Sequence, residues 1–591
     1  MRPSRILTLC LLAAFIPALS QAESFSALTV TIRPRVDGSP LLLDSLRYEN
    51  AEDETFSVAR LSTLFSGFAF ERKDGGFIEL PDQFAWIDAA KRRLTFNLTN
   101  IPPGEYRAFR FHVGLDPESN RTDPASLAPA HPLNPAMNGL HWSWRGGYIF
   151  LALEGRVRGG VSPPEGYSFH FAEDRNRTRI DLPGKWDLRG ESGALIDLDV
   201  AAILNAPRSI SFSRDGNSTH SREEDPIAAA LKANLPGAFR LAQISPQVKG
   251  VTNSNQAKPL FMPSNFTPYP LRISNRFPIP KLPSDNPLLI ERVRLGQRLF
   301  NESRLSRDNS VSCASCHLAS AALSDPRRHS LGIGGRTGNR NAMPLFNLAW
   351  KDSFFWDGRA PSLRAQALMP IEDHLEMDEK LVNVVAKLTA DPGYTQLFSE
   401  AFTPGEITPE KIGLAVENFV LTLTSFDSKF DQAMRGAAKL TPLEKRGFEL
   451  FMTEYEPRTG RLGADCFHCH GGALFTDHQF HNNGLSNTGD IGRESVTGNP
   501  RDRHRFATPS LRNVALTAPY MHDGRFGTLE EVIAHYTSGV HRSETLDPNL
   551  AKHPPGGIPL PRSDQRALIA FLQTLTDPQF SSADHEPSSA H

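Results

Sequence analysis

Short segments in which apolar and polar residues alternate fill the first third of the chain. They cover residues 28–32, 64–70, 94–98, 106–113, 148–153 and 167–171. Turn residues separate them, as in Asp74-Gly75-Gly76 and Pro102-Pro103-Gly104. Alternation with a period of two, punctuated in this way, is typical of a β-sandwich or barrel. We therefore predict an all-β domain over residues 23–240, closed by a helix over 226–241.

The pattern changes after residue 240. Residues 241–283 are rich in Pro, Asn and Ser, a composition typical of a semi-rigid linker. Asp285, Asn286 and Pro287 then form a helix start signal before the apolar residues of 288–300. From there we predict two mostly α-helical domains, over residues 284–440 and 441–579. The serine-containing tail, 580–591, is expected to be disordered.

The second half of the chain is an internal duplication. Residues 295–300 (LGQRLF) match residues 446–451 (RGFELF), and further on Asn347 matches Asn513. Nine residues after these asparagines, the segment that begins with Trp356 (WDGR) matches the one that begins with His522 (HDGR). Two similar domains that face each other are the expected product, so the chain is multidomain.

Composition narrows the possible partners and the compartment. The 591 residues exceed what a single core supports, and 64 basic against 66 acidic residues leave a net charge of −2 without a basic block. Nucleic acid is therefore not an expected partner. Residues 1–22 combine basic, apolar and small-residue regions typical of a cleavable secretory signal. The apolar run, 6–16, has about half of the roughly 20 residues that span a membrane, and no lipidation signal precedes Cys10.

The cysteines define the candidate chemistry. One of the five, Cys10, lies in the predicted signal, and the other four belong to two CxxCH motifs. Such a motif offers two thiols to the haem vinyl groups and one imidazole to the iron. Zinc or redox sites, or a disulfide framework, are the alternatives, but duplication and export favour two covalent c-type haems in the periplasm. The haem-binding residues would be Cys313, Cys316, His317, Cys466, Cys469 and His470.

The duplication predicts that the two irons differ. Fourteen residues after Trp356 stands Pro370, and fourteen after His522 stands Tyr536. This position would offer a distal side chain to the iron. Proline has no donor atom, whereas a phenolate oxygen can ligate iron. The first iron should therefore have an open site, where peroxide can bind, and the second should be closed by Tyr536, with Met521 or His522 as alternatives.

Residues 284–579 resemble the bacterial di-haem cytochrome c peroxidase and MauG family, on both CxxCH motifs and both DGR segments. The resemblance implies that Trp356 bridges the haems, with Trp350 as an alternative, and that Glu376 is the distal acid/base; otherwise Glu376 would be a surface carboxylate. It also implies an inter-haem calcium site at Asn341 and at the carbonyls of Thr517 and Pro519. Tyr536, and the lack of a histidine in the loop 332–335, resemble MauG and MbnH rather than the peroxidase branch, although His329 lies close to this loop.

Residues 25–235 resemble the copper-binding MbnP family. The segment that carries the resemblance is HWSWRGGY, residues 141–148, followed by a later strand that ends in His170. The resemblance implies that His141 and His170 bind copper, with His112 and His131 as alternative ligands. It also implies that Trp142 or Trp144 is converted to kynurenine. The alternative is that both indoles fill the core of a sheet.

Together, the resemblances imply a periplasmic enzyme that uses hydrogen peroxide to form a high-valent iron state. This state would oxidise a tryptophan in the enzyme's own copper-binding domain, which is thus its protein substrate. One alternative is a peroxidase that takes electrons from a small cytochrome or cupredoxin. Another is a non-catalytic protein that binds copper or transfers electrons.

Overall fold

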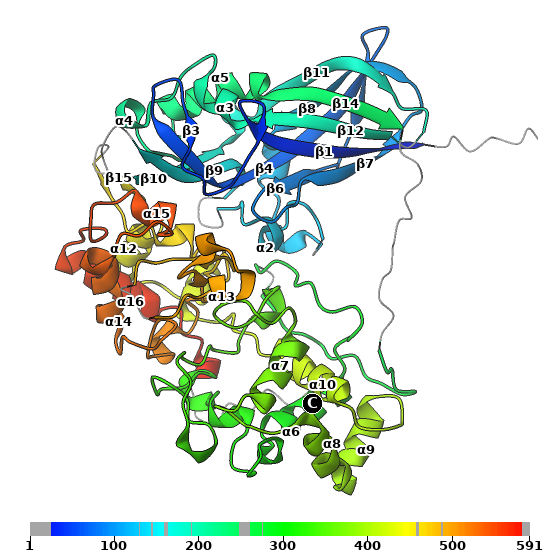
Figure 1. Cartoon of the computed structure of the whole chain (residues 1–591), viewed down its shortest axis with the longest axis vertical. Helices are drawn as coiled ribbons and strands as arrows, with labels where there is room; N and C mark the ends of the chain where they lie inside the picture. The colour runs from blue at the N-terminus through cyan, green and yellow to red at the C-terminus, as the bar shows by residue number, and fades with distance from the viewer. Residues whose placement is uncertain are drawn as a thin grey trace, which may run out of the picture.

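The computed structural model describes residues 25–128, 130–142, 146–158, 164–190, 192–246, 260–274, 276–456, 460–485 and 489–581. The predicted signal at 1–22, Trp144, and all of the tail but its first two residues lie outside these ranges. Two parts are evident, a sheet-rich part at the top of Figure 1 and a mostly helical part below it. The predicted fold class, an all-β domain followed by mostly α domains, is confirmed.

Two sheets enclose the core of the first domain. One sheet runs in the order β14 (Phe239–Pro246), β12 (Ser192–Asp199), β1 (Ser26–Val36) and β2 (Ser39–Pro40), and β7 (Thr95–Ile101) also pairs with β1. The other runs β11 (Thr178–Asp187), β8 (Glu105–Val113), β4 (Thr55–Arg72), β9 (Ile149–Arg158), β10 (Glu165–Ala172) and β13 (Ser218–Thr219). Three short strands pair with β4: β3 (Tyr48–Glu49), β5 (Phe77–Leu80) and β6 (Ala85–Asp88). Every segment predicted from alternation overlaps a strand, and the arrangement is a β-sandwich.

Short helices fill the connections of this domain. They are α1 (Pro117–Asn120), α2 (Pro135–Asn138), α3 (Val200–Asn205), α4 (Phe212–Asp215) and α5 (Pro226–Ala238). The helix predicted over 226–241 ends at Ala238, because the next residues form β14 and pair with β12. The first domain thus continues to Pro246, past the predicted boundary at residue 240.

The second part of the predicted linker packs on the helical part of the chain. Phe277 is buried against Trp350, with ring centroids 5.5 Å apart, and the Trp350 indole donates a hydrogen bond to the carbonyl of Pro278 at 2.6 Å. Leu260 and Tyr269 pack on the same core. These apolar side chains make 260–283 an arm of the first helical unit.

The helical part consists of two units. The first contains α6 (Ile290–Phe300), α7 (Leu363–Glu372), α8 (Leu381–Thr389), α9 (Pro392–Ala401), α10 (Pro409–Leu421) and α11 (Lys429–Met434). The second contains α12 (Pro442–Phe451), α13 (Glu494–Thr497), α14 (Leu529–Ala534), α15 (Pro548–Ala551) and α16 (Arg562–Gln573). Two small ribbons, β15 (Tyr455–Glu456) with β16 (Arg461–Leu462) and β17 (Phe480–His481) with β18 (Phe506–Ala507), complete the second unit.

The repeated sequence produces the same helix crossing in each unit. A Cβ on Gly296 of α6 would lie 2.0 Å from the carbonyl oxygen of Ala415 on α10. A Cβ on Gly447 of α12 would lie 1.9 Å from that of Ala567 on α16. The glycine shared by LGQRLF and RGFELF therefore lets two backbones touch. Asn347 and Asn513, the matched asparagines, both have left-handed backbone at φ 56°.

The first domain docks on the second helical unit. Helix α15 packs on β10, and the Arg156 guanidinium on β9 binds the carbonyls of Ser543, at 3.0 Å, and Leu546. Asp44 and Arg505 form an ion pair at 3.3 Å across the same interface. Over the described residues, no helix is long and apolar enough to cross a membrane.

Candidate functional site

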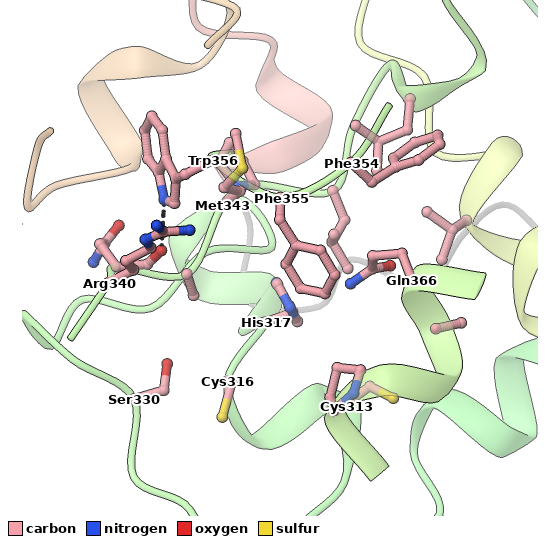
Figure 2. Close-up of a pocket in the computed structure, with 18 of the residues that line it drawn as sticks. Cys313, Cys316, His317, Ser330, Arg340, Met343, Phe354, Phe355, Trp356 and Gln366 are labelled. Atoms are coloured by element: carbon pink, nitrogen blue, oxygen red, sulfur yellow. Dashed lines mark hydrogen bonds between the residues drawn. The ribbon is translucent and has the colours of Figure 1, made fainter. Parts of the chain in front are cut away.

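The first CxxCH motif forms a tight turn at the wall of a cavity. Cys313 opens a 3₁₀ turn, Cys313–Ser315, and His317 follows it. The Nδ1 of His317 contacts the carbonyl oxygen of Leu323 at 3.0 Å, which leaves Nε2 for another partner. Both thiols are free (Figure 2). Thiols and imidazole on one turn fit covalent haem attachment and axial ligation.

The cavity beside this motif has a volume of about 510 Å³. Its wall includes Cys313, Cys316, His317, Gln366, Pro370, Glu376 and Trp356. Figure 2 shows His317 with Phe355 nearby, and Trp356 at one side of the cavity. The size and the donor set fit a haem group.

Pro370 and Glu376 line this cavity from neighbouring segments. Pro370 lies in the last turn of α7. Ser362 caps the start of this helix, where its side chain accepts a hydrogen bond from the backbone amide of Ala365. Glu376 follows in a turn, in which its backbone amide donates a hydrogen bond to the carbonyl of Asp373 at 3.0 Å. Burial, with a smaller contribution from Asp373, raises the pKa of Glu376 to about 7. A carboxyl group with this pKa can both take and give a proton near neutral pH.

The loop 332–335 holds the Glu376 segment in place. The Ile333 amide donates to the Glu376 carbonyl at 2.9 Å. Ser330 and Gly332 line the cavity, whereas His329 is not among the described lining residues.

Trp356 lies between the two helical units. Its indole donates to the carbonyl of Asn341 at 2.9 Å, and its own carbonyl accepts from the Ala507 amide of the second unit at 2.8 Å. The Asn341 amide in turn donates to the carbonyl of His522 at 2.8 Å. Trp350 is instead buried against the arm described above. The calcium site at Asn341, Thr517 and Pro519 stays a prediction.

The second CxxCH motif repeats this geometry. A 3₁₀ turn spans Cys466–His468, and the Nδ1 of His470 contacts the carbonyl oxygen of Phe475 at 3.3 Å. The thiols of Cys466 and Cys469 are free. This motif also fits covalent haem attachment.

Tyr536 lies close to these thiols, at the start of a π-helical turn over His535–Gly539. Burial, together with the nearby Cys469 and Cys466, raises the pKa of Tyr536 to about 12. The amide of Asn483 donates to the phenol oxygen at 3.3 Å and contacts the sulfur of Met521 at 3.4 Å. Tyr536 and Met521 therefore both remain close to this centre, whereas the ring of His522 stacks on Phe506.

Residues 290–439 match the model of the family described as di-haem cytochrome c peroxidase. Over 300 residues the chain is 41% identical to "Methylamine utilization protein MauG" of Methylorubrum extorquens, a match that covers 50% of this chain and 80% of that protein. The chain belongs to the di-haem cytochrome c peroxidase family. The predicted haem-dependent oxidoreductase that acts on peroxide is confirmed at this level.

Other matches each cover one part of the chain. The MauG of Methylophilus methylotrophus is 35% identical over 50% of this chain and 84% of its own length. A solved "MauG-like protein associated with microbial copper homeostasis" is 33% identical, covers 54% of this chain and 99% of its own, and has a TM-score of 0.49. Residues 25–221 match the MbnP family model. This di-haem peroxidase is therefore fused to an MbnP domain, as predicted.

The MbnP domain brings its candidate residues to the domain interface. Trp142 is buried at the edge of the core and, with His141 and His170, lines a cavity of about 110 Å³. Phe467 and His468 of the second haem motif line the same cavity. Trp144 lies outside the described residues. Trp142 thus lines the same cavity as residues of the second CxxCH motif.

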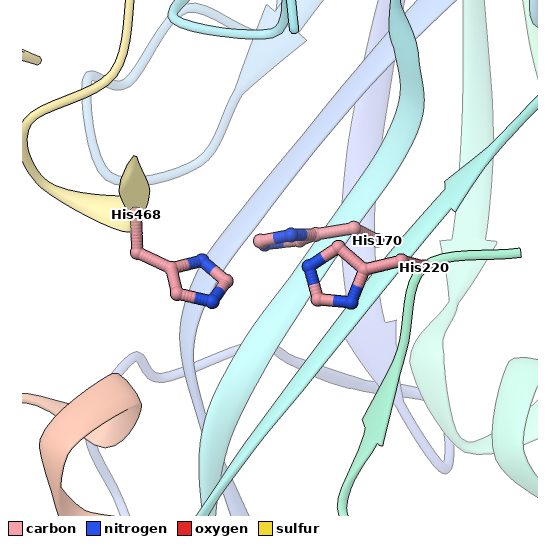
Figure 3. Close-up of side chains that lie close together, drawn as sticks. All are labelled: His170, His220 and His468. Carbon is pink, nitrogen blue, oxygen red and sulfur yellow. The ribbon is translucent and has the colours of Figure 1, made fainter. Parts of the chain in front are cut away.

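His141 and His170, the predicted copper ligands, both line this cavity, and their binding of copper stays a prediction. The ring of His141 packs on Tyr148, with centroids 4.6 Å apart, while His170 lies next to His220. His220 reaches His170 because β10 pairs in parallel with β13, with Phe169 opposite Thr219. His112 and His131 lie outside the group formed by His170, His220 and His468, in which one ring nitrogen from each lies within 4.8 Å of the others (Figure 3).

Sequence reasoning missed three residues of these sites. Gln366 lines the large cavity four residues before Pro370, one turn earlier on α7. The four-residue spacing on a helix was the available signal. His468 lies inside the second CxxCH motif, so its position in the motif was the available signal. His220 follows a strand that is too short to be predicted from the sequence.

Proposed function

We propose that this di-haem peroxidase is a periplasmic enzyme that uses hydrogen peroxide to oxidise Trp142 of its own MbnP domain to kynurenine. The observation that supports it is the shared cavity in which Trp142 meets Phe467 and His468. The stacked rings of Trp142 and His220 have centroids 5.6 Å apart, and those of His220 and Phe467 are 5.8 Å apart. Aromatic rings thus connect Trp142 to the second CxxCH motif.

Two c-type haems, when bound, would supply the redox chemistry by taking up the oxidising equivalents of peroxide. The protein side chains move the protons. Glu376 takes a proton from the nearer oxygen of peroxide and returns it to the farther one, so that water can leave. A positioned acid/base of this kind contributes about two to four powers of ten in rate. Trp356, between the units, is the proposed route for electrons.

The overall reaction balances with two molecules of hydrogen peroxide. The indole gains two oxygen atoms and its C2–C3 bond breaks, which gives N-formylkynurenine. It loses four electrons, two to each peroxide, and the four oxygen atoms of the two peroxides are balanced by two in the product and two in released water molecules. Hydrolysis of the formyl group then releases formate and leaves kynurenine. Holding enzyme and substrate in one chain raises their effective concentration to about the millimolar range.

Peptide mass spectrometry on full-length, haem-loaded protein tests the proposal. Kynurenine is expected at position 142 after peroxide is added, and it should be absent in the double variant Cys313→Ala/Cys316→Ala, which lacks both thiols that attach the first haem. Trp142→Phe and Trp144→Phe form a matched pair, and only the first should abolish the product. An unmodified Trp142, together with steady peroxide turnover on an added electron donor, would instead indicate an ordinary peroxidase.

A further inference from the structure

A histidine of the second helical unit lies between two carboxylates. The Nε2 of His481 lies 2.7 Å from a carboxylate oxygen of Asp477, and its Nδ1 lies 2.6 Å from one of Asp547. The side chains of His481, Asp477 and Asp547 are only 21%, 17% and 9% exposed, so solvent screens this group weakly. These three residues are called the Asp–His–Asp bridge below.

The contacts within the bridge fix its charge. Burial lowers the pKa of His481, but the two carboxylates outweigh burial, so this pKa lies well above its ordinary value. Burial raises the pKa values of Asp477 and Asp547, but His481 outweighs it, and both lie below their ordinary range. At neutral pH, two carboxylates and one imidazolium therefore leave one negative charge on the bridge.

The bridge lies against the sulfur of Cys469 in the second haem motif. The Sγ of Cys469, one nitrogen of His481 and one carboxylate oxygen of Asp547 all lie within 4.8 Å of one another. The backbone amide of Asp477 donates to the carbonyl of Cys469 at 2.8 Å. Because Cys469 is a haem-attachment residue and both imidazole nitrogens already face carboxylates, this group is not free to hold a separate metal ion. It lies instead where the second haem would join the protein.

Carboxylates dominate the electrostatic field at this sulfur. Burial raises the pKa of the Cys469 thiol well above its ordinary value, and Asp547, Asp477 and Glu154 raise it further, in that order. Glu154 belongs to the MbnP domain, where Arg60 binds it at 3.0 Å. The two aspartates of the bridge are thus the stronger sources of the negative field. A field that disfavours a thiolate favours, by the same Coulomb law, a more positive and therefore oxidised haem.

The backbone holds both carboxylates of the bridge in place. Asp477 accepts a hydrogen bond from the amide of Gln479 at 2.9 Å, and Asp547 accepts one from the amide of Asn549 at 2.8 Å. The amide of Asp547 donates to the carbonyl of Asn482, the residue after His481, at 3.0 Å. Helix α15, which Asp547 precedes, packs on β10 of the MbnP domain. The negative charge is therefore fixed beside the domain interface.

We propose that the Asp477–His481–Asp547 bridge lowers the reduction potential of the second haem and so makes this haem easier to oxidise. The three residues act through their charge, which stabilises the positive charge left when the haem loses one electron. At an effective dielectric constant of about 20, a unit charge roughly 10 Å away changes an equilibrium constant about tenfold. The inference goes beyond the proposed function, because it requires a haem at the second motif but neither peroxide nor Trp142.

Redox titration of the full-length, haem-loaded protein tests the proposal, with electron paramagnetic resonance to distinguish the two haems. Asp477→Asn and Asp547→Asn each remove one charge and keep the shape of the side chain. At pH 6 the remaining carboxylate should keep His481 protonated. Each variant should then raise the potential of the second haem by about 59 mV, which corresponds to a tenfold change in its ferric-to-ferrous ratio.

Asp564→Asn is the matched control. The Asp564 side chain is 15% exposed and binds Arg446 at 2.8 Å, and it is not among the main groups that act on Cys469. This variant should leave the potential of the second haem unchanged. An equal shift in the control would assign the effect to a general loss of charge or structure and would overturn the proposal.

A triple variant removes any dependence on the protonation of His481. Asp477→Asn/His481→Gln/Asp547→Asn carries no charge at these positions at any pH and should show the same upward shift. Iron content and the spectrum of the second haem show whether this haem is intact in each variant. An unchanged potential in variants that keep the second haem would contradict the proposal. Because the titration uses no peroxide, its failure and a failure of tryptophan oxidation are distinguishable.

Discussion

Gly166 of the MbnP domain touches the main chain at Pro548 of the second helical unit. A Cβ at Gly166 would lie 1.8 Å from the Pro548 carbonyl oxygen. The contact lies on β10, the strand that carries His170, so it holds the tryptophan-bearing domain against the second haem motif.

Gly166→Ala should therefore loosen the interface. An added methyl group in a closely packed contact costs about 1–3 kcal/mol, and here it meets rigid backbone. Small-angle scattering should show a larger radius of gyration, and kynurenine formation should slow. Gly190→Ala is the control, because a Cβ there meets nothing within 4 Å. Equal compactness of the two variants would contradict the predicted role of Gly166.

Glu376 should give the reaction with peroxide a pH dependence centred near 7. Its pKa is raised to about 7, and only the carboxylate can accept a proton from peroxide. The rate should therefore fall about tenfold for each pH unit below 7 and level off above it. Stopped-flow absorption of the haems measures this rate.

Two substitutions separate this explanation from others. Glu376→Gln should lower the rate by about two to four powers of ten and remove the pH dependence. Asp373→Asn removes a negative charge that raises the pKa of Glu376, so the midpoint should move to lower pH. A midpoint that stays at 7 in Glu376→Gln would assign the titration to another group.

Trp356→Phe should slow electron exchange between the haems. The variant loses the indole and leaves the Asn341 carbonyl without its donor, at a stability cost of about 1–3 kcal/mol. Trp350→Phe also loses a buried indole hydrogen bond, so it is a matched control for stability. Only the Trp356 variant should delay the spectral response of the second haem to peroxide. The same delay in both variants would point to a general structural effect.

Tyr536→Phe should change the axial ligation of the second haem. It removes the oxygen near Cys466 and Cys469 but keeps the ring, so the iron–phenolate bands should vanish from the resonance Raman spectrum. Met521→Leu should leave them unchanged. The opposite result would identify Met521, whose sulfur contacts the same Asn483 amide, as the ligand.

Local sequence patterns predicted the strands in which apolar and polar residues alternate. The elements that these patterns did not predict depend on pairing between strands that are distant in the sequence. β1 is half-buried and alternates cleanly, so its sequence predicts it. β12 is buried on both faces along most of its length, and its role depends on pairing with β1 and β14. The helix predicted to residue 241 ended early for the same reason.

The haem motifs were predictable because each is a local turn with defined chemistry. The interface was not. His220 follows a two-residue strand whose position is set by β10, some fifty residues earlier in the chain. His468 acquires a role only when another domain approaches it. Neither relationship is visible in a pattern of neighbouring residues.

The covered second motif constrains the order in which this protein can be assembled. Phe467 is only 6% exposed, and the side chain of His468 is 2% exposed. A haem-attaching enzyme needs access to Cys466 and Cys469 on either side of them. We therefore expect the MbnP domain, although it is synthesised first, to dock only after the second haem is attached. Under the proposed function, docking would then bring the tryptophan to the oxidising centre only after that centre is complete.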